Sequence, residues 1–122
     1  MSKVLYLPLK KEWYEMIESG VKTEEYREIK EHWIKRLVEY ADGYKIPKFM
    51  LEVYTEHITC LKILLLESKL EFIEFDFIKF SYGYTKRTMT FECKGITIDK
   101  GKKEWGAPDN EVFIIKLGER IE

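Results

Sequence analysis

The spacing of apolar residues changes part-way along the chain, and this change constrains the fold more than any other feature. Before Leu70, apolar residues mostly recur every three or four positions, which is the spacing of one face of a helix. From Leu70 they alternate with polar residues, as in a half-buried strand. Helical segments followed by strands, rather than the two in alternation, predict an α+β fold.

The first half is expected to begin with a strand and to continue as helices. Residues 4–9 form an apolar run broken by Pro8, which is typical of a strand that ends or lies at a sheet edge. A helix is expected over 10–20, because Gly20 suits the left-handed conformation that ends helices. The same spacing predicts further helices over 30–41 and 47–69, with a strand in the second half of the latter as the alternative.

Strands should dominate the second half. Alternation over 70–82 shifts phase at Phe77 and Ile78, which indicates a bulge or a strand buried on both faces. Alternation resumes over 87–98. Residues 99–110 are rich in glycine, proline and charge and predict a loop, after which 111–118 form a last apolar strand.

Length and composition limit the classes of protein that this chain can belong to. With 122 residues it is expected to form a single domain, 1–122. The net charge of −1 provides no whole-molecule attraction to nucleic acid or to an anionic membrane, so such binding would need a local patch. A charged leader and a long apolar run are both missing, which indicates a cytoplasmic protein with no membrane partner.

The residues that most often ligate metals do not form a recognisable pattern. Cys60 and Cys93 match neither a metal nor a redox spacing and are expected to be buried structural thiols. His32 and His57 have no ligand spacing with each other or with either cysteine. We therefore expect no metal and no cofactor.

The segment Ser19–Ile29, SGVKTEEYREI, holds the strongest candidate site. If 23–29 is extended, Thr23, Glu25 and Arg27 share one face, Glu24, Tyr26 and Glu28 share the other, and Lys22 lies at the start of the strand. A carboxylate between two cations stays ionised and orients them, and the two cations could then bind an anion. The alternative is a solvated, salt-bridged strand face.

The pattern G-x-K-x-x-E-x-R, formed by Gly20, Lys22, Glu25 and Arg27, resembles the signature of the ASCH domain family, a branch of the PUA-like folds. Residues 83–84, 88–92 and 104–108 also look similar to small stand-alone bacterial and phage ASCH proteins. The resemblance covers most of the chain and is weakest over residues 45–70. It implies a PUA-like mixed β-pseudobarrel flanked by helices, with a cleft beside the motif.

The resemblance also implies a function. ASCH domains are thought to bind RNA or nucleoside- and nucleotide-like ligands, and some small members are amidohydrolases that deacylate 4-acetylcytidine. In those enzymes a lysine and a threonine act together; Lys22 matches the lysine, whereas Glu25 stands in the place of the threonine. Thr23 lies two residues away, roughly 6.5 Å along a strand. If the chain is an enzyme, the candidate residues are Lys22, Glu25 and Thr23.

Aromatic and basic residues elsewhere could complete a nucleotide site. Tyr84, Lys86 and Arg87 follow a glycine in SYGYTKRT, where a ring could stack on a base and the cations could hold its phosphate; the alternative is an ordinary turn between strands. Trp105 could cap a flat ligand or pack its loop onto the core. Trp13 and Trp33 lie on helical stripes and are assigned to the core. A module that binds another protein through its aromatic surface is a further possibility.

Overall fold

A computed structural model describes residues 2–122, which form two compact units. The first unit contains the chain up to Tyr26 together with Glu74–Glu122, and the second unit contains Arg27–Ile73. The chain therefore leaves the first unit after Tyr26, within the candidate motif, and returns to it at Glu74.

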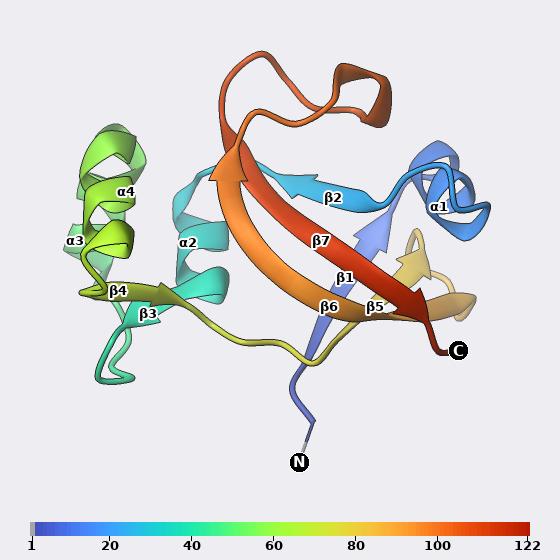
Figure 1. Cartoon of the computed structure of the whole chain (residues 1–122), viewed down its shortest axis with the longest axis horizontal. Coiled ribbons are helices and arrows are strands. Elements are labelled where there is room, and N and C mark those ends of the chain that lie inside the picture. Colours follow the sequence, from blue (N-terminus) through green and yellow to red (C-terminus); the bar gives the residue numbers. More distant parts are fainter. Residues whose placement is uncertain (1) are drawn as a thin grey trace. The chain divides into compact units, whose positions relative to one another are not determined.

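A five-stranded mixed sheet forms the body of the first unit. In spatial order its strands are β1 (Val4–Leu9), β5 (Phe77–Tyr82), β6 (Thr88–Asp99), β7 (Val112–Arg120) and β2 (Glu24–Arg27). β1 pairs with β5 in parallel, whereas β5 with β6 and β6 with β7 are antiparallel. The long strands β6 and β7 curve together into a half-barrel (Figure 1). The expected α+β fold with a β-pseudobarrel is confirmed.

The core of the first unit follows the alternation of β1 and β5. Leu5, Leu7 and Leu9 point inward, and Leu5 and Leu7 pair with the fully buried Ile78 and Phe80. Helix α1 (Lys11–Glu18) packs against this sheet, where the ring of Tyr14 meets that of Tyr82 edge-on at a centroid distance of 5.2 Å. Gly20 has φ +86° and follows the end of α1, as its position in the sequence predicted. The edge strand with Pro8 is likewise confirmed.

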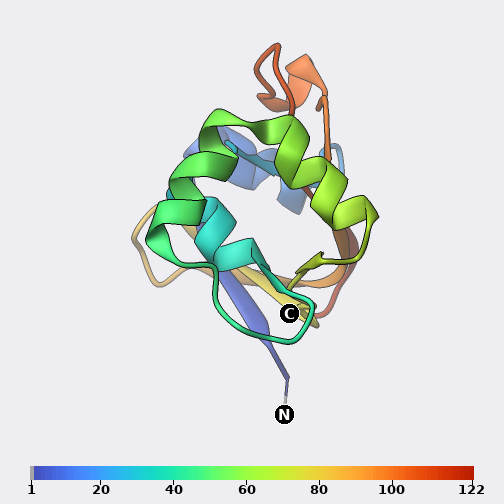
Figure 2. The ribbon, with the colours of Figure 1, turned by 90° about the vertical axis from the view of Figure 1, so that its left-hand side faces the viewer.

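Three helices and a two-stranded sheet form the second unit. They are α2 (Glu31–Leu37), β3 (Val38–Tyr40), α3 (Lys48–Glu56), α4 (Ile58–Leu66) and β4 (Leu70–Phe72). β3 and β4 are antiparallel, and α3 runs directly into α4 (Figure 2). The core of this unit contains the large apolar side chains Ile34, Leu37, Tyr54, Leu61 and Leu70.

Two predicted helices end differently from expectation. The predicted helix over 30–41 is wrong in its second half, because Val38 is extended (φ −129°, ψ 142°) and pairs with Phe72 of β4. The helix over 47–69 is confirmed in type but is broken at His57, whose φ of −126° and ψ of 72° separate α3 from α4. The alternative of a strand in its second half is therefore wrong.

Two predicted strands also differ from the structure. Residues 70–82 form β4 and β5 in different sheets, so the phase shift reflects a break between two strands rather than a bulge. The predicted strand over 23–29 is shorter, with β2 limited to Glu24–Arg27. A real irregularity lies in β6, where the register shifts on either side of Cys93.

Four assignments of single residues to the interior are wrong. Cys60 is exposed, and Cys93 is only partly buried. Trp13 and Trp33 are only half-buried, although both lie on helical stripes, and a cationic side chain lies over each ring: Lys22 at Trp13 and Arg27 at Trp33. Tyr14, next to Trp13, is the residue that α1 buries fully.

Candidate functional site

Lys22 of the motif is turned into the first unit. Its backbone N–H donates to the carbonyl of Met16 at 3.0 Å, which continues the chain reversal that Gly20 begins at the end of α1. Its side chain is only 2% exposed. Burial of a lysine to this extent is rare in proteins unless the ammonium group is paired.

Glu25 of β2 provides the partner. Its carboxylate oxygen Oε1 lies 2.8 Å from Nζ of Lys22, and Glu25 is itself 6% exposed. Removing two charges from water costs several kcal/mol for each ion, and their mutual attraction offsets this only when the geometry is good. The pair is therefore not the solvated salt bridge that was the alternative from sequence.

Two aromatic rings enclose the ammonium group of Lys22. Its Nζ lies 4.7 Å from the ring centroid of Trp13 in α1 and 5.5 Å from that of Tyr26 in β2. The negative faces of aromatic rings attract cations, and the attraction strengthens where water is excluded. We call Lys22, Glu25, Trp13 and Tyr26 the lysine box. Trp13 is thus a site residue that the sequence had assigned to the core.

The long loop between β6 and β7, residues 100–111, packs against the lysine box. The amide of Lys102 donates a hydrogen bond of 3.0 Å to the Tyr26 hydroxyl, which in turn donates to Oε1 of Glu24 at 2.8 Å. Burial, opposed by the bond from Lys102, raises the pKa of Tyr26 to about 12. The hydroxyl therefore keeps its proton at neutral pH.

Two glycines allow the loop to approach the rings closely. A Cβ added to Gly101 would lie 2.7 Å from the ring of Tyr26, and one added to Gly106 would lie 2.8 Å from the ring of Trp13. Gly106 also has φ +95°, which other residues rarely adopt. Trp105 lies on this loop beside Lys102, whose Nζ is 4.2 Å from its ring centroid.

The other residues predicted for the site have different surroundings. Arg27 is the last residue of β2, two positions after Glu25, and its guanidinium lies 4.9 Å from the ring centroid of Trp33; Arg36 approaches the same ring at 5.2 Å. Thr23 is exposed, and its carbonyl accepts a hydrogen bond from the amide of Leu117. Since Glu25 is buried, Thr23 and Glu25 do not share the environment that a common strand face predicted.

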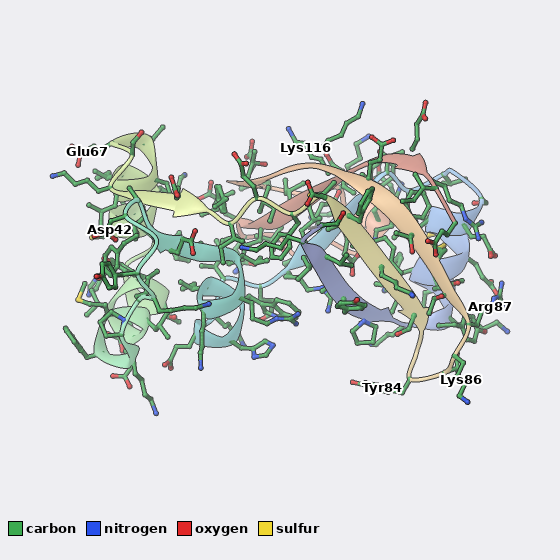
Figure 3. The ribbon with its side chains drawn as sticks, turned by 90° about the horizontal axis from the view of Figure 1, so that it is seen from below. Asp42, Glu67, Tyr84, Lys86, Arg87 and Lys116 are labelled. Carbon is green, nitrogen blue, oxygen red and sulfur yellow. The ribbon has the colours of Figure 1, made fainter. Side chains whose placement is uncertain are left out.

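Tyr84, Lys86 and Arg87 lie together on the hairpin between β5 and β6 (Figure 3). Tyr84 is 96% exposed. Arg87 is held by Glu18 of α1, whose carboxylate oxygens lie 2.9 and 3.2 Å from Nη2, and its guanidinium lies over the ring of Tyr82 at 4.9 Å. The hydrogen bond that Arg87 donates to the Glu18 carboxylate raises the pKa of Arg87. The hairpin therefore presents the exposed ring of Tyr84 close to the positive charge of Lys86.

Sequence reasoning found Lys22 and Glu25 but missed the residues that surround them. Tyr26 lies inside the motif and alternates with Glu25, yet its hydrogen bond to Lys102 joins residues 76 positions apart. Gly101 and Gly106 in a loop with a tryptophan were the available signal, since glycine often marks a place where the backbone must approach a ring. Periodicity alone could not reveal such contacts.

Comparisons of the chain with protein-family models, with curated proteins and with solved structures found no match. Within residues 2–122, no group of three or more His, Cys, Asp and Glu side chains is arranged to hold a metal ion. None of the helices in this described part of the chain has the length and apolar character needed to cross a membrane.

Proposed function

We propose that this chain is a small cytoplasmic ASCH-type module that binds RNA or a modified nucleoside or nucleotide at the lysine box. The observation that carries the proposal is the buried ion pair between Lys22 and Glu25, on the segment that resembles the ASCH signature. An apolar pair of similar volume often stabilises a fold as well or better. A buried charge pair flanked by aromatic rings is therefore better explained by a ligand than by stability.

The chemistry of the box suits the edge of a nucleobase. One N–H of the Lys22 ammonium donates to Glu25, and an ammonium group has three such donors. The remaining donors can bind a base carbonyl, while a carboxylate can accept from an exocyclic amino group. Proteins read unpaired bases through such edge contacts together with stacking on aromatic rings.

The hairpin between β5 and β6 has an exposed aromatic ring and an exposed basic side chain, which a ligand longer than one nucleotide could contact. Tyr84 offers an almost fully exposed ring for stacking, and the exposed Lys86 follows two residues later. Base stacking on an aromatic side chain contributes about 1–3 kcal/mol per base, and it tolerates different bases. The hairpin is therefore proposed as an outer contact for RNA, with the lysine box as the selective one.

A thermal-shift screen of nucleosides, nucleotides and short RNAs tests the proposal, because a ligand that binds only the folded protein raises its Tm. The variant Lys22→Met should abolish the shift, whereas Lys48→Met, which removes an exposed lysine of the second unit, should leave it unchanged. If phosphate contacts contribute, affinity will fall as salt rises. Equal loss of binding in both variants would refute the assignment to Lys22.

A second candidate is an amidohydrolase that deacylates a modified nucleoside such as 4-acetylcytidine. The observation that favours it is the contact between a buried carboxylate and a buried ammonium at Lys22 and Glu25. Glu25 could activate a water molecule while Lys22 stabilises the oxyanion that develops on the acetyl carbonyl. Release of cytidine from 4-acetylcytidine, followed by chromatography, is the test; no turnover at high protein concentration would exclude this candidate.

A further inference from the structure

We propose that loop 100–111 is a gate over the lysine box, and that the Tyr26 hydroxyl is its latch. This inference deepens the proposed function, on which its biological meaning rests, by assigning a means of controlling access to Lys22. The physical claim concerns how the loop opens, and it can be tested without any ligand.

The need for a gate follows from the burial of Lys22. At 2% exposure its ammonium group cannot meet a ligand from solution while its surroundings stay as they are. Trp13 and Tyr26 enclose Nζ, and the loop backbone lies directly against both rings, at Gly106 and Gly101 respectively. The rings of Trp13 and Tyr26 therefore cannot move toward loop 100–111 unless the loop itself moves first.

The loop is suited to moving as a unit. Its ends are fixed, because Asp99 and Val112 are paired where β6 and β7 meet. Within it, Ala107 donates to the carbonyl of Lys102, and Lys103 pairs with Asp109, so the loop keeps an internal structure when displaced. Loops of this length without a strand or long helix are often lids over functional sites.

Tyr26 connects the loop to the box. The hydrogen bond from the Lys102 amide to its hydroxyl holds the loop on the ring that itself faces Lys22. The hydroxyl is oriented by its own bond to Glu24. With its pKa raised to about 12, the Tyr26 hydroxyl keeps its proton at neutral pH, so it can accept from Lys102 and donate to Glu24 at the same time.

The first experiment measures the accessibility of Lys22 in the unmodified protein. Acetylation of lysines by dilute acetic anhydride, read by peptide mass spectrometry, should be far slower at Lys22 than at an exposed lysine such as Lys48. If the loop opens locally, the rate at Lys22 will rise only slightly with low concentrations of urea, since local opening exposes little surface. A urea dependence equal to that of global unfolding would overturn the gate, as would a rate at Lys22 equal to that at Lys48.

The second experiment removes the latch. Tyr26→Phe keeps the ring beside Lys22 but loses the hydroxyl, and it should speed acetylation of Lys22 about fivefold, which corresponds to about 1 kcal/mol for the lost hydrogen bond from Lys102, the one that holds the loop. Tyr44→Phe is the matched control, because Tyr44 is an exposed tyrosine of the second unit and is not part of the lysine box or its loop. Equal rates at Lys22 in the Tyr26→Phe variant and in the control, with circular dichroism showing both folded, would overturn the role of Tyr26.

The outcomes separate the gate from the proposed function. If the acetylation results are as expected but no nucleoside, nucleotide or RNA binds, the gate stands and the ligand class is wrong. If a nucleotide binds yet Lys22 opens only on global unfolding, the ligand class stands and the gate is wrong. If Tyr26→Phe fails to fold, the urea dependence of the unmodified protein still decides the question.

Discussion

Replacing Lys22 by methionine tests the argument that the lysine box contains a buried charge pair. Methionine has nearly the length of the lysine stem, so the change removes the charge and leaves most of the volume. Glu25 then keeps a carboxylate at 6% exposure without the ammonium that lies 2.8 Å away in the unmodified protein. Removing one partner of a buried pair costs about 3–5 kcal/mol.

We expect the lower end of this range, about 3 kcal/mol, because Glu25 has other interactions besides Lys22. This loss corresponds to a fall in Tm of roughly 10–15 °C for a chain of this size. Glu25→Met should cost a similar amount for the complementary reason. The double variant Lys22→Met with Glu25→Met should lie within about 1 kcal/mol of the unmodified protein, since neither charge is then left alone.

Urea unfolding of all four proteins, followed by circular dichroism and by tryptophan fluorescence, measures these free energies. Coincident transitions by the two probes justify a two-state treatment. If each single variant loses less than about 1 kcal/mol, the pair behaves as an exposed salt bridge and the reasoning from burial is refuted. If the double variant is stable but no longer binds nucleotides, the charges serve the ligand rather than the fold.

Three further predictions follow from other parts of the structure. Phe80→Ala should destabilise the protein by about 3–5 kcal/mol in the same unfolding assay, because its fully buried side chain fills the interior of the sheet. Gly106→Ala should reduce stability by about 1–3 kcal/mol, as it places a methyl group 2.8 Å from the Trp13 ring at φ +95°, and the fluorescence of Trp13 should change with it. In a spectrophotometric titration, Tyr26 and Tyr54 should ionise near pH 12, above the value of about 10 for an unperturbed tyrosine, and Tyr26→Phe should remove one of these late steps. Because these tyrosines release their protons near pH 10 in the unfolded chain, their contribution to stability should be fully present below that pH and be lost between about pH 10 and 12.

The sequence correctly predicted the helices and strands that are determined by residues within a single short segment. The edge strand with Pro8 and the helix that ends before Gly20 depend on residues within one segment, and both are confirmed. The helix predicted to continue past Leu37 fails because β3 depends on pairing with β4, more than thirty residues later; Val38 faces Phe72 in that pair. A β-branched residue such as Val38 can be part of a helix or of a strand, and here the pairing with Phe72 determines that it is extended.

In the candidate site, too, the sequence predicted what depends on neighbouring residues and missed what depends on distant ones. Lys22 and Glu25 were identified from their spacing, but their burial depends on Trp13 from α1 and on a loop that follows β6. Trp13 occupies a helical stripe, which is the pattern of a core residue, and only the nearby ammonium group shows that it belongs to the site. Thr23 and Glu25 were placed on one strand face, but Thr23 precedes β2 and is exposed.

The pairing of cations with aromatic rings limits where a base could stack. Each of the three tryptophans has a cation over its ring: Lys22 at Trp13, Arg27 and Arg36 at Trp33, and Lys102 at Trp105. A ligand that stacks on Trp105 must use its other face or displace Lys102, and Trp33 has a guanidinium from two different positions near its ring. Tyr84, at 96% exposure, needs no such displacement. Tyr84→Ala should therefore weaken RNA binding more than Trp105→Phe does, and the opposite order would place the stacking contact on loop 100–111.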